Sequence, residues 1–133
     1  MEGTHRLSRQ TARWSRYAQV TVHVAAAAGP AVRVVAEVSG GRGASFGIAV
    51  GAGCAEAERF REEARDGARY ALMRLPEEAR GVLVSVVEIV TAPADTGPGD
   101  VKFAAAHAVW RALGREPDRW PWTGEDGDPV FPS

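Results

Sequence analysis

The sequence predicts an α+β protein, built as a two-layer α/β sandwich of one sheet and two helices. Three short segments with strand patterns come first, followed by a helix, a Val-rich strand and a second helix. In a chain of 133 residues, this β-β-β-α-β-α order favours a mostly antiparallel sheet with both helices on one face. We therefore expect a flexible basic arm at residues 1–15, a single sandwich domain at 16–114 and an acidic tail rich in Pro, Gly and Trp at 115–133.

Alternating residues predict the first two strands, over 16–28 and 31–38, with a turn at Gly29-Pro30 between them. One face of each strand carries Val or Ala at every second position, and we expect this face to pack on the helices. The residues on it are Val20, Val22, Val24, Val32, Val34, Ala36 and Val38. The other face is more polar and is expected to lie open to solvent or to a partner. Its candidate binding residues are Thr21, His23 and Arg33.

A glycine-dense segment follows, and the third strand is predicted within it at residues 45–50. Arg42 is the only charged residue between Glu37 and Glu56. The first helix begins directly afterwards, so its unpaired N–H groups are expected to face this loop. We therefore predict an anion-binding loop here; the alternative is a tight turn whose glycines supply positive φ angles. The residues of this candidate site are Gly41, Arg42, Gly43, Gly53 and Cys54.

Two helices and a central strand complete the pattern. The first helix, over residues 54–75, has apolar residues at intervals of three and four. Residues 82–91 are apolar on both faces, which is typical of a central strand. The second helix, over 97–113, is predicted to begin after an N-cap at Asp95-Thr96 and to end at Gly114.

The overall charge and the cysteine content narrow the class of protein. A net charge of −1 and a pI near 6.3 provide no basic field, so DNA is not expected as a partner. No apolar run approaches the ~20 residues that a membrane-spanning helix needs, and the N-terminal residues lack the pattern of a signal peptide. Cys54 is the one cysteine, which rules out an internal disulfide. These features predict a cytoplasmic protein that does not bind membranes.

Residues suited to catalysis or metal binding are sparse. A cysteine nucleophile at Cys54 would need a neighbouring base. The three histidines, His5, His23 and His107, are expected on the arm, on a strand and on a helix. This separation predicts neither a Cys–His pair nor a metal site. The glycine segment also lacks the Lys-Ser/Thr that ends a phosphate-binding loop, so we expect no catalytic residue and no cofactor.

Several segments resemble domain IV of elongation factor G, which the ribosomal-protection proteins share. Residues 84–91, Val-Ser-Val-Val-Glu-Ile-Val-Thr, are similar to the family's strand Val-Val-Asp-Val-Lys-Val. Asp95-Thr96 followed by Val-Lys-Phe-Ala at 101–104 is similar to its Asp-Ser and Phe-Lys-Ile-Ala, and residues 16–24 to its Gln-Tyr-Gly-His-Val-Lys-Ile-Lys-Val. Residues 39–43 also match its Ser-Gly-Gly-Arg-Gly loop. Because that loop precedes the strand in the family, the two matches compete, and we favour the strand.

The resemblance implies the fold of ribosomal protein S-five domain two, with a left-handed βαβ crossover. In the family, domain IV reaches the decoding centre of the small ribosomal subunit through its tip loops. The resemblance therefore implies a module whose partner is RNA or the ribosome. The second tip loop is shortened here to residues 91–94, which argues against a role in translocation.

The leading hypothesis is a non-enzymatic binding or accessory module of this type, in contact with RNA or the ribosome. One alternative is a module that binds a protein partner or forms a homodimer, with apolar anchors at Val35, Phe103, Trp110 and the Trp-Pro-Trp of residues 120–122. A further alternative is a small enzyme that acts on a phosphorylated metabolite, because the same fold supports enzymes in other families.

Overall fold

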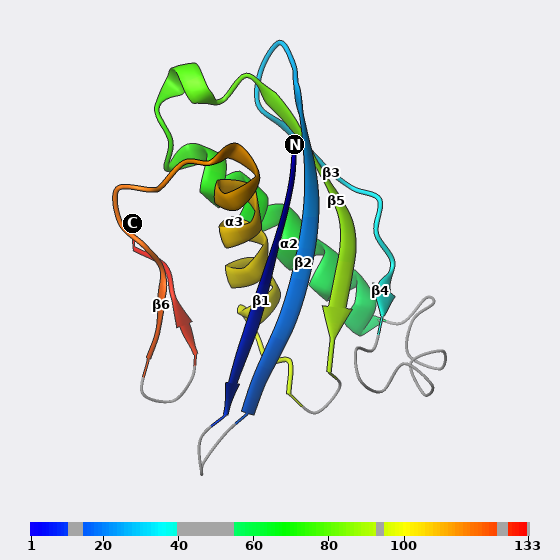
Figure 1. Ribbon diagram of the computed structural model, residues 1–133. Coiled ribbons are helices and arrows are strands. Elements are labelled where there is room, and N and C mark those ends of the chain that lie inside the picture. The colour runs from blue at the N-terminus through cyan, green and yellow to red at the C-terminus, as the bar shows by residue number, and fades with distance from the viewer. Residues whose placement is uncertain (11–14, 40–54, 93–94, 125–127, 133) are drawn as a thin grey trace.

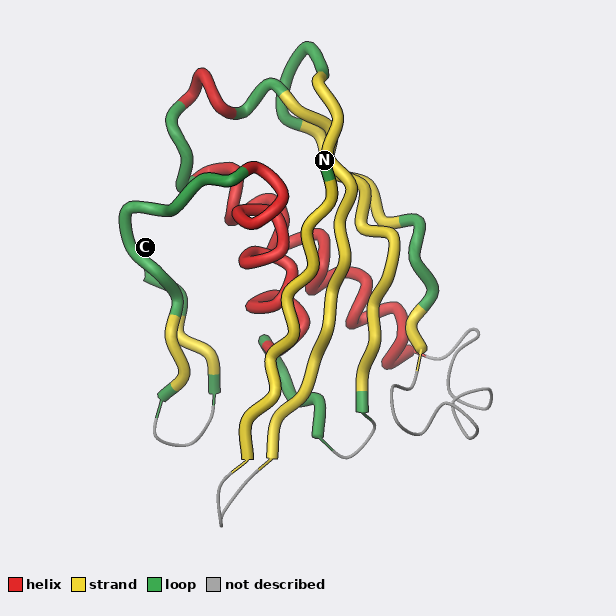
Figure 2. Tube along the Cα trace, viewed as in Figure 1, coloured by secondary structure: helices red, strands yellow, loops and turns green. Residues whose placement is uncertain are grey.

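The protein folds into two layers, a twisted sheet and a pair of helices that lie behind it in Figure 1. The computed structural model describes residues 1–10, 15–39, 55–92, 95–124 and 128–132. Both long helices cover the same face of the sheet, and no helix or strand of the described residues covers the other face, which we call the bare face (Figure 2). The α+β two-layer fold class predicted from the sequence is confirmed.

The main sheet has the strand order β1-β2-β5-β3. Its strands are β1 (Glu2–Gln10), β2 (Ser15–Ala26), β5 (Val82–Thr91) and β3 (Ala31–Val34), and β4 (Val38–Ser39) continues beside β5 after β3. The pairs β1–β2 and β2–β5 are antiparallel, whereas β3 and β4 run parallel to β5. The sheet is therefore mixed, with its Val-rich strand β5 in the interior, as the sequence predicts.

The helices are α2 (Ala55–Met73) and α3 (Asp100–Leu113), and a short 3-10 turn, η2 (Glu77–Ala79), leads into β5. In Figure 1, β3 and β5 both run downward, α2 returns behind the sheet, and β5 lies to the left of β3. This geometry makes the β3–α2–β5 crossover left-handed. Parallel crossovers are right-handed in about 98% of cases, so the handedness is a specific feature of the fold.

The core lies between the two layers and is filled by the residues predicted to face inward on β2. Val20, Val22 and Val24 are all buried. The helices contribute mostly alanines, whose small side chains let α2 and α3 approach closely. At Gly67 of α2 an added Cβ would lie 2.3 Å from the carbonyl oxygen of Lys102 on α3, so only glycine fits this helix crossing.

The expected flexible arm is wrong for residues 2–10, which form the edge strand β1. It pairs with β2 in unbroken register from Glu2↔His23 to Gln10↔Ser15. A Cβ at Gly3 would lie 2.3 Å from the carbonyl oxygen of Ala108, so β1 packs directly on α3. Alternation of apolar and polar residues did not predict this strand, because the inward positions of β1 hold glycine, histidine and arginine. Leu7 is its one apolar residue that faces the core.

Helix α3 begins three residues later than predicted, at Asp100. Gly99 has φ +86°, which no α-helical residue adopts, and the carboxylate of Asp100 accepts the N–H of Gly97 at 2.8 Å. The hydroxyl of Thr96 instead donates to the carbonyl oxygen of Tyr17 on β2. The predicted end of the helix at Gly114 is confirmed, since Gly114 is left-handed with φ +64°. The third strand predicted at residues 45–50 lies outside the described residues.

Candidate binding sites

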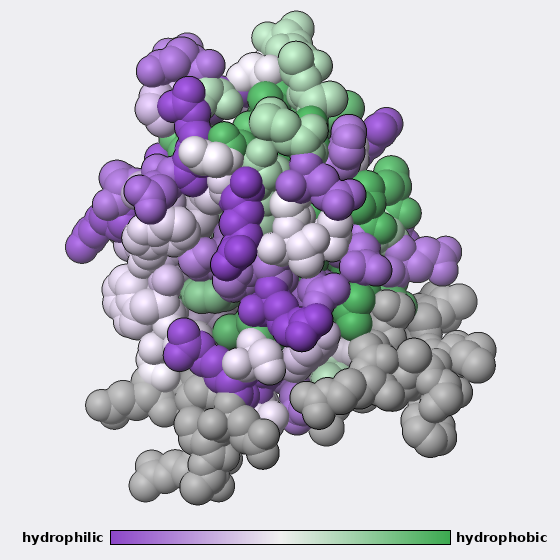
Figure 3. All heavy atoms as spheres, viewed as in Figure 1, coloured by the Kyte–Doolittle hydropathy of each residue, from purple (hydrophilic) through white to green (hydrophobic). Residues whose placement is uncertain are grey.

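The bare face of the sheet carries the predicted residues Thr21, His23 and Arg33. Figure 3 shows mainly hydrophilic residues over this face. Thr21 is only 8% exposed, because its hydroxyl lies between the hydroxyl of Thr4, at 2.9 Å, and the carboxylate of Glu88, at 3.2 Å. His23 and Arg33 are exposed on the same face, on either side of Ser85 of the intervening strand. The fold thus brings the three residues together, and two of them are open to a partner.

Charged side chains of both signs are hydrogen-bonded to neutral polar residues on this face. Arg33 donates from Nε to the hydroxyl of Ser85 at 2.9 Å, and Arg6 donates from Nε to the side-chain oxygen of Gln19 at 3.0 Å. The amide of Gln19 lies 3.4 Å from the carboxylate of Glu88. These contacts hold the two guanidinium groups in place and leave their Nη groups to a ligand. The predicted anion loop, with Gly41, Arg42, Gly43, Gly53 and Cys54, lies outside the described residues.

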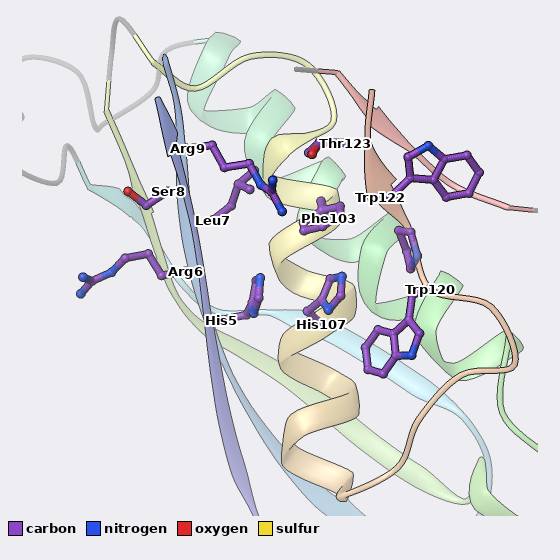
Figure 4. Close-up of a pocket in the computed structure, with 11 residues that line it drawn as sticks. His5, Arg6, Leu7, Ser8, Arg9, Phe103, His107, Trp120, Trp122 and Thr123 are labelled. Atoms are coloured by element: carbon purple, nitrogen blue, oxygen red, sulfur yellow. The ribbon is translucent and has the colours of Figure 1, made fainter. Parts of the chain in front are cut away.

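A groove of about 730 Å³ lies on the other side of β1, and we call it the β1–α3 groove. One wall is β1 over residues 5–9, the opposite wall is the C-terminal segment 120–123, and Phe103 and His107 of α3 form the floor. In Figure 4, His5, Leu7 and Arg9 point into this groove, whereas Arg6 and Ser8 point away toward the bare face. The groove is therefore lined by aromatic rings, an arginine and the edge of a strand.

Three rings are stacked at the floor of the groove. His5 and His107 stack with their centroids 4.6 Å apart, and Trp120 stacks on the other face of His107 at 5.2 Å. Burial, with Arg111 nearby, lowers the pKa of His5 to about 4. Burial, with His5 and Arg111 nearby, lowers the pKa of His107 to about 4. Both rings are therefore neutral at pH 7 and behave as flat aromatic surfaces.

The C-terminal segment is attached to the domain through aromatic and ionic contacts. Trp120 meets the edge of Trp110 at 5.3 Å. Further along, Phe131 packs on Tyr70 at 5.4 Å and accepts the ammonium group of Lys102 over its ring at 4.3 Å. The sequence left open whether the tryptophans of this segment pack on the domain or meet a partner. Trp120 packs on the domain, and the residue is still 45% exposed.

A buried carboxylate fixes the start of α3 and the last residues of the chain. Asp100 is fully buried and lies 3.4 Å from Nη1 of Arg16, whose Nη2 also pairs with Asp128. Burial raises the pKa of Asp100 to about 6, although the N–H of Gly97 and the charge of Arg16 oppose the shift. Burial also raises the pKa of Glu63, which accepts the N–H of Gly99 at 3.1 Å. These two carboxylates bind the N–H groups of Gly97 and Gly99 and the guanidinium of Arg16, so their role is structural.

In the ranges that the structure describes, no three His, Cys, Asp or Glu side chains gather to form a possible metal site, and no helix is long and apolar enough to cross a membrane. The stacked His5 and His107 present ring faces to each other and are not arranged to chelate an ion. Sequence reasoning missed the β1–α3 groove because its walls are more than 100 residues apart. The signal for β1 was the alternation of Thr4, Arg6 and Ser8 with the residues that face α3.

Comparisons with known proteins support the fold. A crystal structure of a protein from Thermus thermophilus matches this chain with a TM-score of 0.62 and 16% sequence identity. The match covers 97% of this chain, and the chain spans only 16% of the length of that structure. No protein-family model matches the sequence, and no curated protein matches it. The chain is therefore an α+β domain similar in fold to one part of a much longer protein.

Proposed function

We propose that the chain is a non-enzymatic binding module that resembles domain IV of elongation factor G and contacts RNA. The observation that carries the proposal is the left-handed β3–α2–β5 crossover, because the sequence resemblance implies this rare feature independently (Figure 1). The segments that resemble the family fall on β2, β5 and the start of α3, and these elements form the centre of the domain.

The bare face of the sheet is the surface proposed for RNA. It presents His23 and Arg33, and Arg42 follows β4 by three residues in the sequence. Hydroxyl, imidazole and guanidinium groups on a flat surface can bind phosphates, 2′-hydroxyls and base edges. Because this face carries charges of both signs, it would neutralise few phosphates. We therefore expect its affinity for RNA to be modest.

The proposal is tested by fluorescence anisotropy with a labelled RNA stem-loop in a KCl titration. Affinity should fall as salt rises, and Arg33→Ala should weaken binding and make the log–log slope shallower by about one. Arg61→Ala is the matched control, since Arg61 lies on α2, in the other layer, and pairs with the exposed Glu58. RNA would be rejected as the partner if the affinity did not change with salt concentration and was unchanged in both Arg33→Ala and Arg42→Ala.

A second candidate function, a protein-interaction or homodimerisation module, is favoured by the C-terminal hairpin. Strands β6 (Trp122–Thr123) and β7 (Pro129–Val130) place Trp122 directly opposite Val130. The two residues are 52% and 37% exposed, and large apolar side chains of this kind are enriched at interfaces. Light scattering across a concentration series should show a dimer that Trp122→Ser dissociates. A monomer at every concentration excludes self-association through the hairpin.

A further inference from the structure

We infer that the free edge of β1 is a docking site for an extended, acidic peptide segment of a partner protein, which adds to the sheet as one more strand. The inference rests on the proposal that the chain is a binding module and does not depend on RNA as its partner. It follows from three properties of the β1–α3 groove: the direction of its backbone groups, its dimensions and its charge.

The hydrogen-bond register of β1 shows which backbone groups face the groove. Met1 and Val24 exchange two backbone hydrogen bonds, of 3.0 and 2.7 Å, so they form a hydrogen-bonded pair of the antiparallel ladder. Such pairs alternate with non-bonded pairs. The N–H and C=O groups of His5 and Leu7 are therefore directed at β2, and those of Arg6 and Ser8 are directed at the free edge.

This register explains why Arg6 and Ser8 line the groove. Their side chains point to the opposite face of the sheet in Figure 4, so they line the groove through their backbone. Among the residues that the structure describes, β1 is the terminal strand of the sheet, and β6 pairs with β7 and not with β1. An unpaired strand edge is a template for another strand, and peptide recognition by strand addition uses such edges.

The dimensions of the groove suit a short extended segment. Five consecutive residues of β1, from His5 to Arg9, form its wall, which corresponds to about 13 Å of strand at about 3.3 Å per residue. Its volume of about 730 Å³ lies within the usual range for binding sites. The floor is apolar, with Phe103 buried and the two neutral histidines stacked beside it. A peptide of about four or five residues would therefore pair with the full length of this wall.

The charge of the groove selects an acidic partner. Among the described residues that line it, Arg6 and Arg9 are the charged ones, and no carboxylate is present. In an added strand, alternate side chains point to opposite faces. Those on the bare face would meet Arg6, and those on the inner face would meet Phe103 and Arg9. The best ligand therefore has acidic residues outward and an apolar residue inward, with a further acid at the end beside Arg9.

The test uses a capped, fluorescein-labelled peptide of sequence Glu-Phe-Glu-Glu-Glu and the full-length protein, with anisotropy as the readout. Ser8→Pro removes an edge N–H without removing a bond to β2, which proline tolerates in edge strands. Loss of this donor should weaken peptide binding about tenfold. The matched control is Ser8→Ala, which keeps the N–H and should bind within about twofold of the wild type. Arg6→Gln should weaken binding mainly at low salt.

A second measurement covers the case in which Ser8→Pro fails to fold. Peptides with a single N-methylated amide are titrated against the wild-type protein, and methylation at alternate positions should abolish binding while methylation at the positions between should not. Equal loss at every position, equal binding by Ser8→Pro and Ser8→Ala, or no binding at millimolar peptide would overturn the inference. If the RNA stem-loop still binds in that case, the binding-module proposal stands. Loss of RNA binding on mutation of Arg9 alone would assign the groove to RNA and overturn the peptide inference.

Discussion

Acidification is expected to weaken this domain through His5 and His107, whose rings are stacked in the β1–α3 groove. The folded state lowers the pKa of each ring from 6.5 to about 4. A group with a lowered pKa resists protonation in the folded protein, so an unfolded chain takes up protons more readily. The stabilisation is therefore complete above pH 6.5 and is lost as the pH falls toward 4.

The magnitude follows from the two pKa values. At about pH 5 each ring contributes a loss of about 1–2 kcal/mol in the free energy of unfolding, after allowance for solvent screening. Asp100 acts in the opposite direction, because its pKa in the folded state is raised from 3.8 to about 6. Its stabilisation grows as the pH falls through about 6, and it offsets about 1 kcal/mol of the loss at about pH 5. The histidines dominate, so the net effect is destabilising.

Urea unfolding followed by tryptophan fluorescence at about pH 7.5, 6 and 5 measures this effect. His107→Phe keeps a ring between His5 and Trp120 but removes one titrating group. With the Asp100 offset unchanged, its free energy of unfolding should fall by about 0–1 kcal/mol over this range, against about 1–3 kcal/mol for the wild type. The control is His23→Gln, which alters a histidine exposed on the bare sheet face and should behave like the wild type. If His107→Phe and the wild type lose stability equally, the stacked histidines do not govern the pH dependence.

Two substitutions test the packing of the layers. Gly67→Ala should lower the free energy of unfolding by about 1–3 kcal/mol, because its Cβ would lie 2.3 Å from the carbonyl oxygen of Lys102. Gly29→Ala is its control, with no atom within 4 Å of the new Cβ, and thermal unfolding should show no loss for it. Asp100→Ala should cost about 1–3 kcal/mol at neutral pH, because the N–H of Gly97 loses its acceptor and Arg16 keeps only its contact with Asp128. An unchanged melting temperature for Gly67→Ala or Asp100→Ala would contradict these assignments.

The central elements of the fold were predictable because their residues follow a clear period. Val20, Val22 and Val24 alternate strictly, and the strand at residues 82–91 and both helices lie where the pattern places them, within three residues. The predicted start of α3 was three residues too early. Proline is typical of the first turn of a helix, so Pro98 suggested a helix that already includes it, whereas the left-handed Gly99 places the start at Asp100. Periodicity carries no information on crossover handedness, which came from the resemblance alone.

The β1–α3 groove could not be predicted because neither of its walls was recognised. One wall was predicted as part of a flexible arm, and the other as part of a C-terminal tail. β1 has the inward sequence Gly3, His5, Leu7 and Arg9, which contains a single apolar side chain. The burial of His5 depends on its contact with His107, a residue 102 positions away in the sequence that no local pattern connects to it. Of the predicted binding residues, Thr21, His23 and Arg33 share one face, and the glycine-loop residues lie outside the described part of the chain.

Amide hydrogen exchange along β1 tests the central claim most directly, because both the edge strand and the groove depend on it. NMR of the protein without ligand should show slow exchange for the N–H groups of His5 and Leu7, which bond to β2. Exchange should be fast for Arg6 and Ser8, and addition of the acidic peptide should slow these two alone. Fast exchange at all four residues would mean that the segment is a flexible arm after all. Slow exchange at all four without ligand would mean that the edge is already paired.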